Sequence, residues 1–240
     1  MRLNKYLARC GIGSRRQCDE FIDKGQIKIN GIINRNFSYQ VQDDDYVQFK
    51  NKILNYIDED YIYIVNKPRG YISTLNDRKN RKKVIDLIPT DIRLFNIGRL
   101  DYNTTGIILF TNNGDIANKL LHPRNKIIKR YYVESSSKLS KNNIDIIRNG
   151  LKIPDFGTVK ADISLLEVKD KDHFIWDVVL TEGKNREIKR IFSYFDSVVR
   201  KLHRYEFAGV QLNNIKSGKY RRISYKQFKK KISFKSNLKK

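Results

Sequence analysis

The chain has 240 residues, of which 49 are Lys or Arg and 26 are Asp or Glu, giving a formal net charge of +23. Such an excess favours polyanionic partners, either nucleic acid or an anionic membrane surface. No apolar run approaches the roughly 20 residues of a membrane-spanning helix, and the N-terminal segment carries charges within its apolar pattern, unlike a signal peptide. The two cysteines, Cys10 and Cys18, are too few for a disulfide framework or a zinc site. We therefore expect a cytoplasmic protein with no bound metal and no membrane partner.

Residues 1–53 form the first predicted domain. Two helical patterns stand at its start, and Ser14 with Gln17 three residues later forms a capping box that begins the second helix. Asn30–Gly31 between two short apolar segments predicts a β-hairpin, and residues 47–49 supply a last short strand. The order is helix, helix, then a small sheet.

Basic residues gather on these two helices. Arg15 and Arg16 stand at the start of the second helix, where free backbone N–H groups and two guanidinium groups suit a phosphate. The segment RLNKYLARCGIGSRRQCDEFIDKGQIKING resembles the S4 RNA-binding domain, a small fold that presents basic residues to structured RNA. We expect RNA contacts from Arg2, Lys5, Arg15 and Arg16.

Residues 54–60 read as a polar linker, residues 61–225 as a second domain and residues 226–240 as a basic tail. Several strands with few helices between them favour an α+β fold with a mixed, largely antiparallel sheet. The sequence predicts strands at 61–65, 107–111, 129–134, 158–168 and 173–180, and helices at 115–121, 144–149 and 185–194. No glycine-rich dinucleotide or P-loop motif occurs, so no nucleotide cofactor is expected.

One carboxylate stands out in the second domain. Asp101 lies in a loop bracketed by Gly98 and Gly106, directly before an apolar strand, with Arg99 two residues away. Burial raises the pKa of a carboxyl group, and a lysine within roughly 4–6 Å lowers it again, which leaves an ionised and poorly solvated nucleophile. The alternative is that Asp101 and Arg99 form a local structural ion pair.

Two further segments carry chemistry. In KRYYV, strand alternation puts Tyr131 and Val133 on one face and Tyr132 on the other. In the predicted helix 185–194, helical spacing puts Arg186, Lys189 and Arg190 on one basic face. A tyrosine beside the carboxylate can stack on a flat ligand, and in a cationic protein that ligand can be a base taken out of an RNA stack.

These segments together resemble the RsuA/RluB-type pseudouridine synthases. GRLDYNTTGIILFTNNGD resembles the catalytic motif of that family, KRY its K-x-Y motif and EGKNREIKRIF its third motif, and an S4 domain is its usual N-terminal partner. The resemblance implies that Asp101 is the nucleophile that isomerises uridine, that Tyr131 stacks on the base and that Lys189 pairs with Asp101. It also implies that Arg99 either helps to hold the flipped nucleotide or fills the gap that the nucleotide leaves. It also implies that no metal, nucleotide or redox cofactor takes part.

The target RNA is less closely defined by the sequence. Family members act mainly on ribosomal RNA, and Asn185–Arg186 in the third motif resembles the large-subunit enzymes of RluB type. We therefore expect a monomer acting on large-subunit (23S) rRNA, either free or in a ribosome assembly intermediate, with Arg186 and Arg190 as further RNA contacts. The alternatives are a small-subunit (16S) rRNA enzyme, a non-catalytic S4-type RNA-binding protein and an S4-linked methyltransferase.

Overall fold

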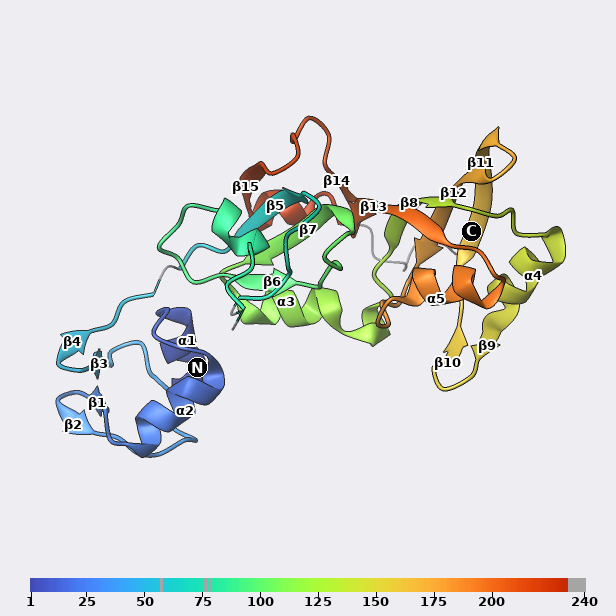
Figure 1. The fold of residues 1–240 in the computed structure, drawn as a ribbon. Coiled ribbons are helices and arrows are strands. Elements are labelled where there is room, and N and C mark those ends of the chain that lie inside the picture. Colours follow the sequence, from blue (N-terminus) through green and yellow to red (C-terminus); the bar gives the residue numbers. More distant parts are fainter. Residues whose placement is uncertain (57, 76, 78, 233–240) are drawn as a thin grey trace. The chain divides into compact units, whose positions relative to one another are not determined.

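The computed structural model describes residues 1–56, 58–75, 77 and 79–232. The chain forms two compact units, Met1–Asp60 with Thr90–Leu94 and Tyr61–Pro89 with Phe95–Lys240 (Figure 1). None of the described helices has both the length and the apolar character needed to cross a lipid bilayer.

The first unit contains two helices and a small antiparallel sheet with strand order β2-β1-β3-β4. As predicted, the Ser14 hydroxyl accepts the Gln17 N–H, and the Gln17 side chain accepts the Ser14 N–H, so α2 begins with a capping box. The elements are α1 (Leu3–Arg9), α2 (Arg15–Asp23), β1 (Ile27–Ile29), β2 (Ile32–Ile33), β3 (Val47–Phe49) and β4 (Lys52–Ile53).

The prediction that residues 47–49 form the last strand of this unit was wrong, because β4 follows β3 in a second hairpin. Its turn, Lys50–Asn51, has both residues in the left-handed region, at φ 50° and 65°. A turn of this kind usually carries Asn-Gly or Asp-Gly, so Lys-Asn gives little signal in the sequence.

The second unit is built on a nine-stranded sheet, counted over the described residues, with the order β11-β12-β8-β13-β7-β5-β15 and with β14 and β6 beside β13 and β7. The pair β13 and β7 is parallel and its other pairs are antiparallel, so the predicted mixed, largely antiparallel α+β fold is confirmed. The strands of this sheet are β5 (Tyr61–Lys67), β6 (Phe95–Ile97), β7 (Thr105–Thr111), β8 (Lys129–Ser135), β11 (Asp162–Asp170), β12 (His173–Leu180), β13 (Val199–Phe207), β14 (Val210–Gln211) and β15 (Tyr220–Ser224).

Helices and a separate hairpin complete the second unit (Figure 1). Helices α3 and α6 contribute buried side chains to one hydrophobic core with strands β5, β6 and β7. The remaining elements are η1 (Val84–Leu87), α3 (Gly114–Leu121), η2 (Pro123–Asn125), α4 (Lys141–Gly150), β9 (Leu151–Ile153), β10 (Gly157–Val159), α5 (Glu187–Tyr194) and α6 (Tyr225–Lys229).

Three predictions for the second unit need correction. The strand expected at 158–168 is divided, because β10 pairs with β9 in a separate hairpin while β11 joins the main sheet. Helix α5 begins at Glu187 rather than at residue 185, and Arg186 is its N-cap in a left-handed conformation with φ 55°. The basic tail does not begin at residue 226, because α6 buries Phe228 completely in the core, and residues 233–240 lie outside the described residues.

Gly106 allows the two halves of the main sheet to meet. It pairs with Lys67 of β5 on one side and with Arg204 of β13 on the other. Its φ of +108° is one that other residues rarely adopt, and an added Cβ would collide with the backbone carbonyl of Arg204. No other residue type fits between these strands without moving them apart.

We predict that Gly106→Ala lowers the free energy of unfolding by about 3 kcal/mol or more, because backbone strain and a steric clash add together. Gly157→Ala is the matched control, since Gly157 also has a positive φ, +92°, but has open space where the Cβ would lie. Urea unfolding of both variants measures the difference, and equal losses of stability would contradict the close approach of β13 to β7.

Candidate active site

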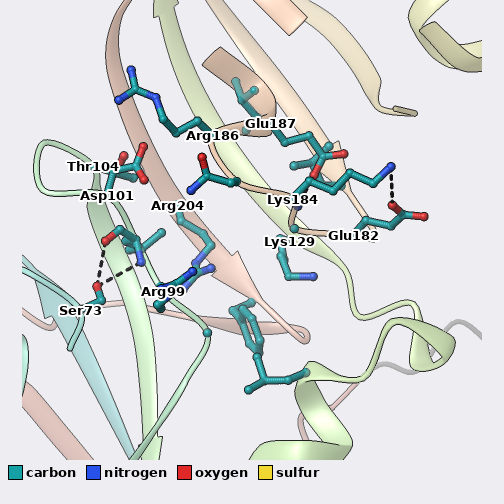
Figure 2. A pocket seen from close by; sticks show the side chains of 18 of the residues that line it. Ser73, Arg99, Asp101, Thr104, Lys129, Glu182, Lys184, Arg186, Glu187 and Arg204 are labelled. Carbon is teal, nitrogen blue, oxygen red and sulfur yellow. Dashed lines mark hydrogen bonds and ion pairs between the residues drawn. The ribbon is translucent and has the colours of Figure 1, made fainter. Parts of the chain in front are cut away.

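A cleft of about 930 Å³ opens in the second unit over the middle of the main sheet. One wall is the loop from Gly98 to Thr104, and the facing wall is the segment from Thr181 to Ile188. Tyr131 of β8 and Arg204 of β13 contribute to the lining between these walls. Figure 2 shows Asp101 and Thr104 on one side of the cleft and the segment with Lys184, Arg186 and Glu187 on the other.

Asp101, which lines the cleft, forms an ion pair with Lys189 of α5. The Lys189 Nζ lies 3.0 Å from the Asp101 Oδ2, and the side chains are 22% and 35% exposed. The predicted pairing of these two residues is therefore present, and Asp101 pairs with Lys189 rather than with Arg99 among the described ion pairs. Both side chains keep part of their surface open, so a substrate can reach the carboxylate.

Hydrogen bonds fix the loop that carries Asp101. The Ser73 hydroxyl donates to the Leu100 carbonyl at 2.9 Å and accepts the Leu100 N–H at 3.1 Å. The Thr104 N–H donates to the Asp101 carbonyl at 3.1 Å. These bonds hold the backbone directly before and after the carboxylate.

Lys67 at the end of β5 supports the same loop, and no pattern in the sequence singles it out. Its side chain is completely buried, and its Nζ donates to the carbonyls of Pro68 at 3.1 Å, Tyr102 at 3.2 Å and Thr104 at 2.7 Å. Burial lowers the pKa of Lys67 from 10.5 to about 8, while the charge of Asp101 acts in the opposite direction. Lys67 thus joins the end of β5 to the loop directly after Asp101.

Tyr131 and Tyr132 point to opposite faces of β8, as the alternation predicts. Tyr131 lines the cleft and is 7% exposed. Tyr132 is 45% exposed, and its ring stacks on Tyr205 with 4.2 Å between the ring centroids. Only the first of the two tyrosines can therefore face a ligand in the cleft.

The predicted arginines lie in different places. Arg99 and Arg186 are exposed and line the cleft. Arg190 is exposed outside the cleft lining, with its guanidinium 4.5 Å from the centre of the Phe156 ring. Four further predicted RNA contacts belong to the first unit, and of these Lys5 is partly buried while Arg2, Arg15 and Arg16 are exposed.

Three further charged residues of the cleft lining are buried or partly buried, and no sequence pattern assigned them a role. Arg204 and Glu187 are buried, at 2% and 3% exposed, and Lys129 is partly buried. Burial, followed by the charge of Arg204, lowers the pKa of Lys129 to about 8, and burial raises the pKa of Glu187. Lys129 stands in the quoted K-x-Y segment, but nothing in the sequence distinguishes a buried lysine from an exposed one.

Within the described residues, no group of three or more His, Cys, Asp or Glu side chains is placed to hold a metal ion. The cleft therefore offers a partly exposed carboxylate paired with a lysine, the ring of Tyr131 and several cations. Such a site can attack an electrophilic carbon and hold a flat, polar ring.

Comparison with known proteins identifies the chemistry. The sequence profile of the RNA pseudouridylate synthase family matches residues 61–194, and that of the S4 domain matches residues 1–47. The chain belongs to the RNA pseudouridylate synthase family. It is accordingly an enzyme that acts on RNA and isomerises uridine, of the RsuA/RluB type, and the predicted family is confirmed.

Relatives of this pseudouridine synthase match it over most of their length. The ribosomal large subunit pseudouridine synthase B of Bacillus subtilis is 34% identical, over 95% of this chain and 94% of that protein. The enzyme of the same name from Buchnera aphidicola is 36% identical, over 93% of this chain and 92% of that protein. A solved structure described as a pseudouridylate synthase superposes with a TM-score of 0.66 at 25% identity, covering 97% of this chain and 100% of its own.

We predict a pH dependence of stability that comes from Lys67. Its pKa is about 8 in the folded protein and 10.5 when unfolded. Between these values the unfolded chain binds more protons, so the contribution of Lys67 to stability rises with pH and is constant below pH 8. The free energy of unfolding of the wild type minus that of Lys67→Met, from urea titrations, should increase between pH 8 and pH 10.5. A constant difference over this range would contradict a buried ammonium group at Lys67.

Proposed function

We propose that this pseudouridine synthase converts one specific uridine of large-subunit rRNA, with Asp101 as the nucleophile. The observation that carries the catalytic part is the 3.0 Å pair of Asp101 and Lys189 at the edge of an open cleft. The target is supported by the two relatives at 34% and 36% identity, whose names assign them to the large ribosomal subunit.

The proposed reaction begins with a uridine turned out of its RNA into the cleft, since a base cannot react while stacked in a helix. Tyr131 stacks against the uracil ring, and the Asp101 carboxylate attacks the ribose–uracil unit so that the N1–C1′ bond breaks. The ring turns while held, its C5 bonds to C1′, and Asp101 is released. Substrate and product contain the same atoms, so the reaction consumes no cofactor or second substrate.

Cations outside the reacting centre have a different proposed role. Arg99 and Arg186, both exposed in the cleft lining, hold the phosphates beside the flipped nucleotide. The S4 domain binds structured RNA through Arg2, Lys5, Arg15 and Arg16, and Arg190 with the basic C-terminal residues adds sequence-independent contacts to phosphate. We propose a cytoplasmic monomer that acts on rRNA, either free or in an assembly intermediate.

We predict that Asp101→Asn folds and binds RNA but forms no pseudouridine, because an amide of the same shape is not a nucleophile. The matched control is Asp162→Asn. Asp162 also pairs with a cation, with its Oδ1 2.9 Å from the Arg148 Nε, but neither residue lines the cleft. A single-turnover assay with rRNA measures product, and thermal unfolding tests the fold. Pseudouridine formed by Asp101→Asn would remove Asp101 from its proposed role.

We predict that deletion of the gene abolishes one pseudouridine in large-subunit rRNA and leaves other sites unchanged. Pseudouridine mapping of both rRNAs with and without the gene measures this, and a plasmid copy should restore the lost site while the Asp101→Asn copy should not. Loss of a small-subunit site instead would favour the alternative target, and no lost rRNA site would contradict rRNA as the substrate.

A further inference from the structure

Arg204 is a buried cation, and one nitrogen of its guanidinium group has no hydrogen-bond partner among the described residues. Its side chain is 2% exposed, and its Nε donates to the Ile107 carbonyl at 2.8 Å. Its Nη2 is buried and has no hydrogen-bond partner among the described residues. Arginine is almost never buried without full pairing, because an unsatisfied charged donor costs stability.

Lys129 lies beside it at the same end of the cleft. The Lys129 Nζ is 5.8 Å and the Arg204 Cζ is 4.9 Å from the centre of the same ring, that of Phe207. The charge of Arg204 contributes to the lowered pKa of Lys129, about 8. Two cations are therefore held close together and largely out of water, although each weakens the other.

The sheet register places both cations next to Tyr131. Arg204 is the direct neighbour of Tyr131 on β13, and Phe207 is the direct neighbour of Lys129. Lys129 and Tyr131 are two residues apart on β8, so they point to the same face. A ring stacked on Tyr131 would thus have donors of Arg204 and Lys129 at one of its edges.

The charges at this end of the cleft favour a neutral ring over a phosphate. Glu187, 3% exposed, faces Lys129 closely enough for its charge to raise the lysine pKa, and its Oε1 is a second buried atom with no described partner. A carboxylate in the group would repel a phosphate. Uracil is neutral and carries an N–H between two carbonyl oxygens, which suits a group that contains donors and an acceptor.

We propose that Arg204, assisted by Lys129, binds a carbonyl oxygen of the flipped uracil and stabilises the negative charge that the ring gains when its bond to ribose breaks. The inference rests on the proposed function, since it takes Asp101 as the group that attacks the ribose side. Arg204 and Lys129 are then catalytic residues that touch the departing base.

Breaking the N1–C1′ bond and forming the C5–C1′ bond conserve electrons and protons. When the N1–C1′ bond breaks, its electron pair leaves with the uracil, and resonance spreads the resulting charge over N1, O2 and O4. Hydrogen bonds from a guanidinium and an ammonium in a sheltered site stabilise that charge more than they stabilise the neutral base. When C5 bonds to C1′, the proton from C5 is lost and N1 gains one, so the ring is neutral again.

The test is a cycle of enzyme variants and substrate analogues. Large-subunit and small-subunit rRNAs are transcribed with uridine, 2-thiouridine or 4-thiouridine, since sulfur accepts hydrogen bonds from N–H donors less well than oxygen. We expect Arg204→Met to slow single-turnover conversion of the uridine RNA on the order of 100-fold, the effect of losing one such donor. We also expect one thio analogue to slow the wild type but to slow Arg204→Met little further.

The ratio of wild-type to variant rates is the decisive quantity, because general effects of sulfur on the RNA cancel in it. A ratio that is the same for all three RNAs would overturn the proposal and leave Arg204 with a purely structural role. Arg148→Met is the control, since it removes a cation paired with Asp162 outside the cleft lining and should convert all three RNAs at wild-type rates. If Arg204→Met does not unfold cooperatively on heating, Lys129→Met takes its place in the same experiment. We then expect Lys129→Met to slow conversion of the uridine RNA and to be slowed little further by one thio analogue.

Failure of the proposed function would be visible separately. Conversion of the small-subunit transcript alone would contradict the proposed target, and product from Asp101→Asn would contradict the proposed nucleophile. In either case the rate ratios for Arg204→Met would still be measured and would decide this inference.

Discussion

One row of residues across the main sheet determines the site. The sheet register places Lys67 of β5, Gly106 of β7, Arg204 of β13, Tyr131 of β8 and Val178 of β12 next to one another in that order. Gly106 is the constraint on which the row depends, because only a residue without a Cβ lets β13 lie against β7. Tyr131 and the two buried cations, Lys67 and Arg204, are therefore brought together by backbone pairing across five strands.

The two fully buried cations of this row act on different atoms. Among the Lys and Arg residues that the structure describes, only Lys67 and Arg204 are buried, at 0% and 2% exposed. Lys67 donates to the carbonyl of Pro68 and to two carbonyls of the loop after Asp101, those of Tyr102 and Thr104. Arg204 donates its Nε to the Ile107 carbonyl, and its Nη2 has no hydrogen-bond partner among the described residues. The first therefore positions the carboxylate, and the second is available for a ligand. The exposed cations, which make up most of the net charge, suit phosphate because they remain solvated.

The sequence predicted what short-range patterns control. The capping box of Ser14, the opposite faces of Tyr131 and Tyr132, and the pairing of Asp101 with Lys189 all follow from local spacing or from the family motifs. Strand β13 was not predicted, since VRKLHRYEF mixes charged and apolar residues without a clear alternation. Lys67 received no prediction, because its partner Thr104 is 37 residues away along the chain and no local pattern connects the two.

The residues that escaped prediction share a physical cause. A lysine or arginine is normally assigned to the surface, and only the three-dimensional pairing of strands reveals that it is enclosed. Enclosing a cation lowers stability unless another group compensates, as the fall of the Lys67 and Lys129 pKa values to about 8 indicates. Lys67 is compensated by carbonyls of its own chain. Arg204 and Lys129 each donate to a single carbonyl, that of Ile107 and that of Ile127, and the Arg204 Nη2 has no partner among the described residues. In the reaction proposed above, a ring that becomes negative adds compensation for both cations at the transition state.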